Sequence, residues 1–192
     1  QALVKNVSVP MLFYLLNGKS RKAYKKLLGL VEEIAVENKV KFFNRPVMLM
    51  CDFEARFIRA VRDLFESVEV KCCFFHFTKN IRTKATTVIN DIEKVAGKTS
   101  EASRMAWMTK KRLMMLALLP EPLIAPEVLG LVHRGLTDAC PELQEAFDSL
   151  FASVIRTYVG TPPECPHPVR PQFRPSIWSV CGMRVRTNNP AE

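Results

Sequence analysis

Three residues in the first half of the sequence have the types and spacing that a reactive or metal-binding site requires. Asp52 directly follows the apolar run VMLMC, and Cys73 and His76 stand three positions apart in KCCFFH. A carboxylate at the end of a buried strand lies where α/β sheets bind ligands, and its oxygens suit a hard cation such as Mg²⁺. The alternative role for Asp52 is to cap the following helix, because aspartate is a favoured N-cap residue.

The cysteine and the histidine allow three interpretations. Together with Cys72 they can contribute to a zinc module, but a structural zinc site needs four ligands. The other cysteines, Cys140, Cys165 and Cys181, are scattered along the chain without pairing. A Cys–His nucleophile needs contact between the two groups and a third group that orients the base, and the sequence indicates neither. The third interpretation is a core thiol beside a hydrogen-bonded histidine.

Apolar periodicity predicts the elements that position these residues. The front of the chain has the pattern strand, strand, helix, strand, helix, strand. We expect strands over 3–9, 11–16, 47–51 and 68–75, and helices over 21–38 and 54–65. Two parallel strands joined by a helix form a right-handed crossover unit, and a hairpin before them favours a mixed sheet of the α/β class.

Beyond His76 the apolar residues recur at helical spacing. We expect helices over 77–96, 100–119, 128–133 and 141–160, with Pro120, Pro122 and Pro126 breaking the second of them. Residues 161–176 are rich in proline and predict a loop. The sequence therefore predicts a front built on a sheet, an all-helical middle and a returning tail.

The composition favours a polyanionic partner. The formal net charge is +9, from 28 Lys and Arg against 19 Asp and Glu, and part of the excess lies in KSRKAYKK near residue 20. Such clusters suit nucleic acid, although a solvated face is the alternative. Six irregularly spaced cysteines without a signal peptide indicate reduced thiols in the cytosol or nucleus. No apolar run approaches the ~20 residues that span a bilayer, so no membrane partner is expected.

Several motifs, taken together, resemble those of Mutator-like (MULE) transposases. MCDFEAR followed by KCCFFHFTKNI resembles their catalytic core, in which an Asp closes one strand and a Cys-x-x-His signature closes the next. LFYLLNGKSRKAYKKLL resembles the segment before that Asp, and LMMLALLP resembles the helical insertion. IWSVCGMRVRTNNPAE resembles the ending, where a Trp precedes RTNN-x-x-Glu. The resemblance covers nearly the whole chain, in order.

The resemblance implies an α/β fold of the RNase H-like type, with a mixed sheet interrupted by an all-helical insertion. The core would occupy 1–76 without its first strand, the insertion 77–160, and a return segment with the last acid 161–192. The family holds two Mg²⁺ (or Mn²⁺) ions with an Asp–Asp–Glu triad. Carried over, Asp52 is the second acid and Glu192 the third, and both are metal ligands.

The other motif residues have implied roles around this triad. Cys73 and His76 correspond to the Cys-x-x-His pair, which shapes the site or contacts DNA near the cut. Trp178 matches the Trp before the last motif, and core packing is its alternative role. The same motif contributes three more residues that shape the site or contact DNA: Arg186, Asn188 and Asn189.

The implied activity is Mg²⁺-dependent DNA cleavage and strand transfer by a nuclear cut-and-paste transposase. Two cations ~4 Å apart activate the attacking oxygen and stabilise the leaving oxygen. The implied partners are transposon ends and target DNA, with a homo-oligomer in the complete protein. No acid precedes Glu32, so the triad's first Asp is missing. We therefore expect a fragment that does not cleave DNA alone; the alternative is a domesticated or decayed copy that binds DNA or protein without catalysis.

Overall fold

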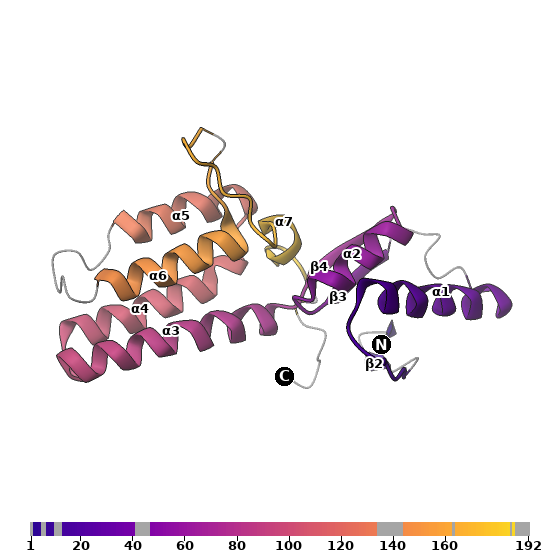
Figure 1. Ribbon diagram of the computed structural model, residues 1–192, viewed down its shortest axis with the longest axis horizontal. Coiled ribbons are helices and arrows are strands. Elements are labelled where there is room, and N and C mark those ends of the chain that lie inside the picture. Colours follow the sequence, from indigo (N-terminus) through magenta and orange to yellow (C-terminus); the bar gives the residue numbers. More distant parts are fainter. Residues whose placement is uncertain are drawn as a thin grey trace. The chain divides into compact units, whose positions relative to one another are not determined.

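The fold is mixed α/β, mostly helical, with a small two-stranded parallel sheet (Figure 1). The chain forms two compact units, one built from residues up to Cys73 and one from Phe74 to Arg186. The computed structural model describes residues 2–4, 7–9, 13–40, 47–133, 144–162, 164–184 and 186.

The first unit contains the expected crossover. Strands β3 (Val47–Cys51) and β4 (Val68–Cys72) pair in parallel, with Val47 opposite Val68 and Cys51 opposite Cys72. Helix α2 (Ala55–Leu64) connects them and buries Ile58, Ala60 and Val61. This confirms the prediction of a strand–helix–strand unit.

The expected mixed sheet is not formed by the described strands. Strands β1 (Ala2–Val4) and β2 (Val7–Val9) make an antiparallel hairpin that is separate from the β3–β4 pair. The predicted single strand over 3–9 is therefore two strands, and 13–16 is not a strand. In the sequence the apolar run over 3–9 is interrupted by two polar residues, Lys5 and Asn6, which the prediction of one continuous strand gave too little weight.

Helix α1 (Arg21–Glu37) forms where its cap and apolar stripe predict it. The hydroxyl of Ser20 accepts a hydrogen bond from the Ala23 N–H at 3.0 Å, which satisfies one of the amides left open at a helix start. The helix packs against α2, and Tyr24 meets Phe57 edge-on with ring centroids 5.3 Å apart. This aromatic contact forms part of the apolar interface between the two helices.

The boundary after β4 differs from the prediction. The strand ends at Cys72, and helix α3 (Phe74–Ala96) begins two residues later, so the expected strand over 68–75 is too long. A short apolar run such as CCFF fits a strand or a helix equally well. Here the helical spacing of the buried Phe77 and Ile81 decides, because it extends the apolar stripe of α3 back to Phe74.

The second unit is a set of packed helices. Helix α4 (Glu101–Met115) packs along α3, and one 3₁₀ turn, Leu116–Leu118, follows it. Helix α6 (Gln144–Val154) widens into a π-helical segment, Ile155–Val159, and ends at Gly160. Gly160 has a φ of +78°, and a Cβ there would lie 2.7 Å from the Val169 carbonyl oxygen, which explains why the helix stops at a glycine.

Helix α5 (Glu121–His133) contradicts the predicted role of its prolines. Pro122 lies in the first turn, where a missing N–H costs nothing, and Pro126 lies inside the helix without ending it. The predicted helix over 128–133 is therefore helical as expected but too short, because the helix begins at Glu121. Packing overrides the local propensity here, because Ile124 and Val128 are fully buried on one face of α5.

Candidate functional site

Asp52 lies at the carboxyl edge of the parallel sheet. It follows β3 and is exposed, and its backbone carbonyl accepts a hydrogen bond from the Glu54 N–H at 2.8 Å. The N-cap residue of α2 is Glu54, so the alternative in which Asp52 occupies the cap position is wrong. The carboxylate therefore stands where the ligand-binding interpretation expects it.

Cys73 lies at the same edge of the sheet. Its N–H donates to the Cys51 carbonyl at 2.8 Å, which continues the pairing one residue beyond β4. Asp52 and Cys73 therefore follow neighbouring strands directly, and the parallel register brings them to one end of the sheet. The two differ in exposure, because the Cys73 side chain is fully buried while Asp52 is exposed.

The thiol of Cys72, which lies opposite Cys51 in the sheet, is held in its neutral form. A hydrogen bond with Cys51 raises the pKa of Cys72, and burial adds to the rise. The thiolate is the form that attacks substrates and binds metals. A zinc module would need Cys72 in that form, so the environment of Cys72 favours the interpretation of a structural core thiol.

We expect the buried thiols to resist alkylation in the folded chain. At pH 7.5 a small thiol reagent should label the exposed Cys181 readily, and label Cys51, Cys72 and Cys73 only after denaturation. Mass spectrometry of labelled peptides measures the order. Rapid labelling of Cys73 in the native chain would contradict its role as a core thiol and favour the nucleophile interpretation.

The described residues test the predicted metal site only in part. Among them, which include Cys72, Cys73 and His76, no group of three His, Cys, Asp or Glu side chains could hold a metal ion. Glu192, the predicted third acid, lies outside the described residues. So do Asn188 and Asn189. A two-ion site of Asp52 and Glu192 therefore stays a prediction.

In the second unit, Arg186 at the start of the RTNN motif lies next to Phe74 of the Cys-x-x-His motif. The Phe74 N–H donates to the Arg186 carbonyl at 2.8 Å, and the Arg186 Nε donates to the Met183 carbonyl at 3.1 Å. His76 lies in the first turn of α3, where it is half-buried and meets Phe75 edge-on. Arg186 and the start of α3 are far apart in sequence and adjacent in space.

Trp178 lies in the core directly behind that first turn. It ends helix α7 (Pro175–Trp178), is fully buried and stacks on Phe77 with ring centroids 4.6 Å apart. Its Nε1–H donates to the carbonyls of Tyr158 and Phe173, both at 3.0 Å. A buried ring cannot stack on a base, so the structure supports the packing role, in which Trp178 fixes the turn that carries the Cys-x-x-His motif.

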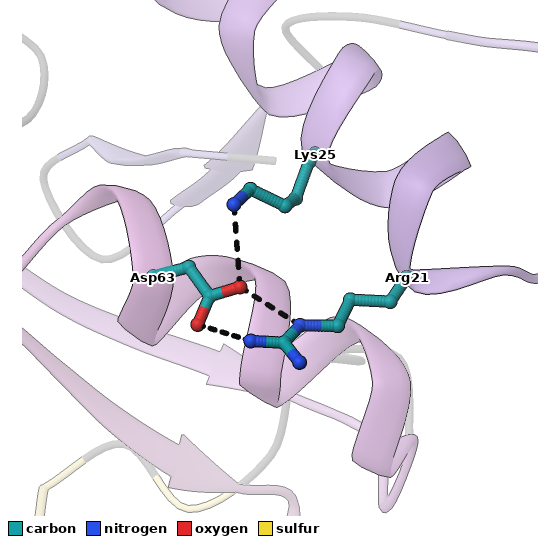
Figure 2. Close-up of polar contacts among 3 residues, drawn as sticks. All are labelled: Arg21, Lys25 and Asp63. Carbon is teal, nitrogen blue, oxygen red and sulfur yellow. Dashed lines mark hydrogen bonds and ion pairs between the residues drawn. The ribbon is translucent and has the colours of Figure 1, made fainter.

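The basic cluster near residue 20 lies along the first turns of α1. Figure 2 shows Asp63 of α2 between Arg21 and Lys25, with the Arg21 Nε at 2.8 Å and the Lys25 Nζ at 3.4 Å from the carboxylate. The hydrogen bond from Arg21 lowers the pKa of Asp63. Lys22 and Lys26 are exposed on the same helix. One carboxylate thus faces a group of cations, and the surface keeps a positive excess.

A cluster around Trp107 was missed by the sequence reasoning. On α4 this residue is 42% exposed, and the Lys110 Nζ lies 3.3 Å from its ring centroid. The available signal was an aromatic residue followed closely by the basic run KKR. The TKKR pattern alone also fits an ordinary solvated helix face.

The fold and site define a class: a mixed α/β protein whose parallel strand pair carries an exposed aspartate at its carboxyl edge, followed by a helical unit. Comparisons of the chain with models of protein families, with curated proteins and with solved structures found no match. None of the described helices has the length and apolar character needed to cross a membrane.

Proposed function

We propose that the chain is part of the catalytic domain of a cut-and-paste DNA transposase of the Mutator-like type. The observation that carries this proposal is the hydrogen bond from the Phe74 N–H to the Arg186 carbonyl. It joins Arg186, at the beginning of the RTNN motif, to Phe74, inside the Cys-x-x-His motif. Contact between these two distant motifs supports the proposal, because the resemblance assigns both to the family's catalytic core.

In this proposal β3, α2 and β4 belong to an RNase H-like sheet, and α3 to α6 belong to its helical insertion. Asp52 and Glu192 are two of three acids that hold Mg²⁺ or Mn²⁺ ions. Carboxylate oxygens suit these hard ions, and paired ions activate the attacking oxygen and stabilise the leaving oxygen of a phosphodiester. The proposal requires a third acid besides Asp52 and Glu192, and residues 1–31 hold neither Asp nor Glu.

DNA is the proposed partner, in a nuclear protein that acts as a homo-oligomer on transposon ends and target DNA. The formal net charge of +9 and the cations along α1 support binding of the phosphate backbone. Contacts of this kind hold DNA in register with little dependence on its sequence. The second candidate is a domesticated or decayed copy that binds DNA or protein without catalysis, and the net positive charge favours DNA binding in either case.

We expect the double variant Lys22→Glu, Lys26→Glu to bind duplex DNA with a weaker salt dependence. Both side chains are exposed on the basic face of α1. Each lost phosphate contact should lower the slope of log K against log salt by about 0.9, so the double variant should lose about 2. Fluorescence anisotropy with a labelled duplex at several salt concentrations measures the slope.

The matched control is Lys98→Glu, which makes the same charge change at an exposed position between α3 and α4. It should leave the slope close to that of the parent. If the parent chain shows no duplex binding at low salt, the proposed DNA partner is wrong. If it binds and the region upstream of Gln1 encodes no aspartate, the non-catalytic copy becomes the better description.

A further inference from the structure

Helix α4 has an exposed face with an unusual mixture of side chains. An ordinary solvent-facing stripe is charged or polar, yet this one carries a tryptophan and two methionines among its cations. Its members recur at i, i+3, i+4, i+7, i+8 and i+11, and all are exposed: Arg104, Trp107, Met108, Lys111, Arg112 and Met115. The buried face of α4 includes Ala102, Ala106 and Leu113, and the helix packs along α3.

The Trp107 ring is held in place from two sides. Its Nε1–H donates to the Glu93 carboxylate at 3.1 Å, and the hydroxyl of Ser103 donates to the same oxygen at 3.3 Å. The Lys110 ammonium lies 3.3 Å from the ring centroid, over one face. A ring that is fixed before binding loses little conformational entropy when a ligand stacks on it, so this arrangement favours recognition.

The cation over the ring, Lys110, is nearly buried. Lys110 is only 7% exposed, and no carboxylate in the described part of the chain forms an ion pair with its ammonium. Burial, Arg82 and Lys111 lower the pKa of Lys110, in that order. Cations from α3 and α4 therefore lie near the Lys110 ammonium, and a bound anion would relieve their mutual repulsion.

We propose that this α4 face binds single-stranded DNA, with one base stacked on Trp107 and neighbouring phosphates held by the exposed Lys111 and Arg112, while the Lys110 ammonium stays against the ring and adds its positive charge. Exposed aromatic rings flanked by cations are how proteins hold unpaired strands. In a duplex the bases are already stacked on one another, so the ring selects an unpaired strand. The inference rests on the proposed function, because cleavage and strand transfer expose such strands.

Tryptophan fluorescence tests the proposal directly. The chain has two tryptophans, of which Trp107 is exposed and Trp178 is fully buried, so Trp178 serves as an internal reference. Titration of the whole chain with an oligo-dT 20-mer should quench the Trp107 emission. In Trp107→Phe the remaining Trp178 emission should not change, while Trp107→Ala should bind about tenfold or more weakly by anisotropy.

Lys110→Met tests the electrostatic part of the proposal. It removes the ammonium and keeps an unbranched side chain, so binding of the strand should weaken about tenfold or more while the thermal midpoint of the free chain stays level or rises. The matched control Lys98→Met removes a cation at an exposed position outside the face and should change neither quantity much. Equal weakening in both variants would contradict a specific role for Lys110.

The other arms separate the proposal from its competitors. A duplex of the same length should bind without quenching Trp107, because its contacts lie on α1. Strand binding without quenching, or parental affinity in Trp107→Ala, overturns the stacking proposal and leaves the proposed function intact if duplex binding persists. Tighter binding of oligo-U, or of an acidic peptide of equal charge, overturns the assignment to DNA. If the parent chain binds neither the single strand nor the duplex, both proposals are contradicted.

Discussion

Replacing Trp178 with alanine is expected to lower the free energy of unfolding of the helical unit by about 4 kcal/mol, in the range found for buried aromatic residues. The ring is fully buried, stacks on Phe77 and meets Tyr158 edge-on at 6.2 Å. The substitution leaves a cavity between these rings and removes the donor that two backbone carbonyls share. Urea denaturation followed by circular dichroism measures the loss.

Two further variants separate the parts of this effect. Trp178→Phe keeps a ring against Phe77 and loses the indole N–H, so it should cost less, about 1–3 kcal/mol for the unsatisfied carbonyls and the smaller ring. Trp107→Ala is the matched control, because the same residue type is exposed on α4 and its removal leaves no core cavity. If Trp178→Ala were no more destabilising than Trp107→Ala, Trp178 could not be the centre of this core.

The parts of the fold that the sequence predicted correctly have signals that act locally. Ser20 before a helical stripe fixed the start of α1, and the run VMLMC between Pro46 and Asp52 fixed β3. Each signal depends on residues a few positions apart, so it can be recognised in the local sequence without knowledge of the tertiary contacts. The end of β4 and the course of α5 depend instead on what the rest of the unit packs against them, and local propensity gave the wrong answer for both.

The residues of the candidate site also fall into two groups, those that local sequence patterns placed correctly and those whose positions depend on tertiary contacts. The position of Asp52 at a strand end follows from the apolar run before it, and the parallel register then brings Cys73 to the same edge. The contacts of Arg186 with Phe74 and of Trp178 with Phe77 join distant segments. Hydrophobic periodicity does not predict contacts between distant segments. Only the family resemblance indicated that these motifs belong together. The Trp107 cluster was missed because the basic run after the tryptophan also fits an ordinary solvated helix face, and spacing alone does not show that Lys110 is buried against the ring.

The prediction with the largest effect on activity concerns Asp52. In a longer polypeptide that includes an upstream aspartate-bearing strand and retains Glu192, Asp52→Asn should reduce Mg²⁺-dependent DNA cleavage by at least about 1,000-fold. The amide has nearly the same shape and no charge, so it binds a divalent cation poorly, and losing metal stabilisation of the transition state costs several kcal/mol. A nicking assay on supercoiled DNA, with and without Mg²⁺, measures the change.

Asp63→Asn is the matched control for this variant. It is the same substitution in the same unit, but the Asp63 carboxylate forms ion pairs with Arg21 and Lys25, so cleavage should persist. Asp52→Asn should also still bind DNA, because removing an anion does not weaken attraction to phosphate, and this separates a catalytic defect from a binding defect. Parental cleavage in Asp52→Asn would assign the chemistry to other acids. If the longer parent binds DNA without cleaving it, the result would instead favour a transposase-derived protein that has been retained because it binds DNA.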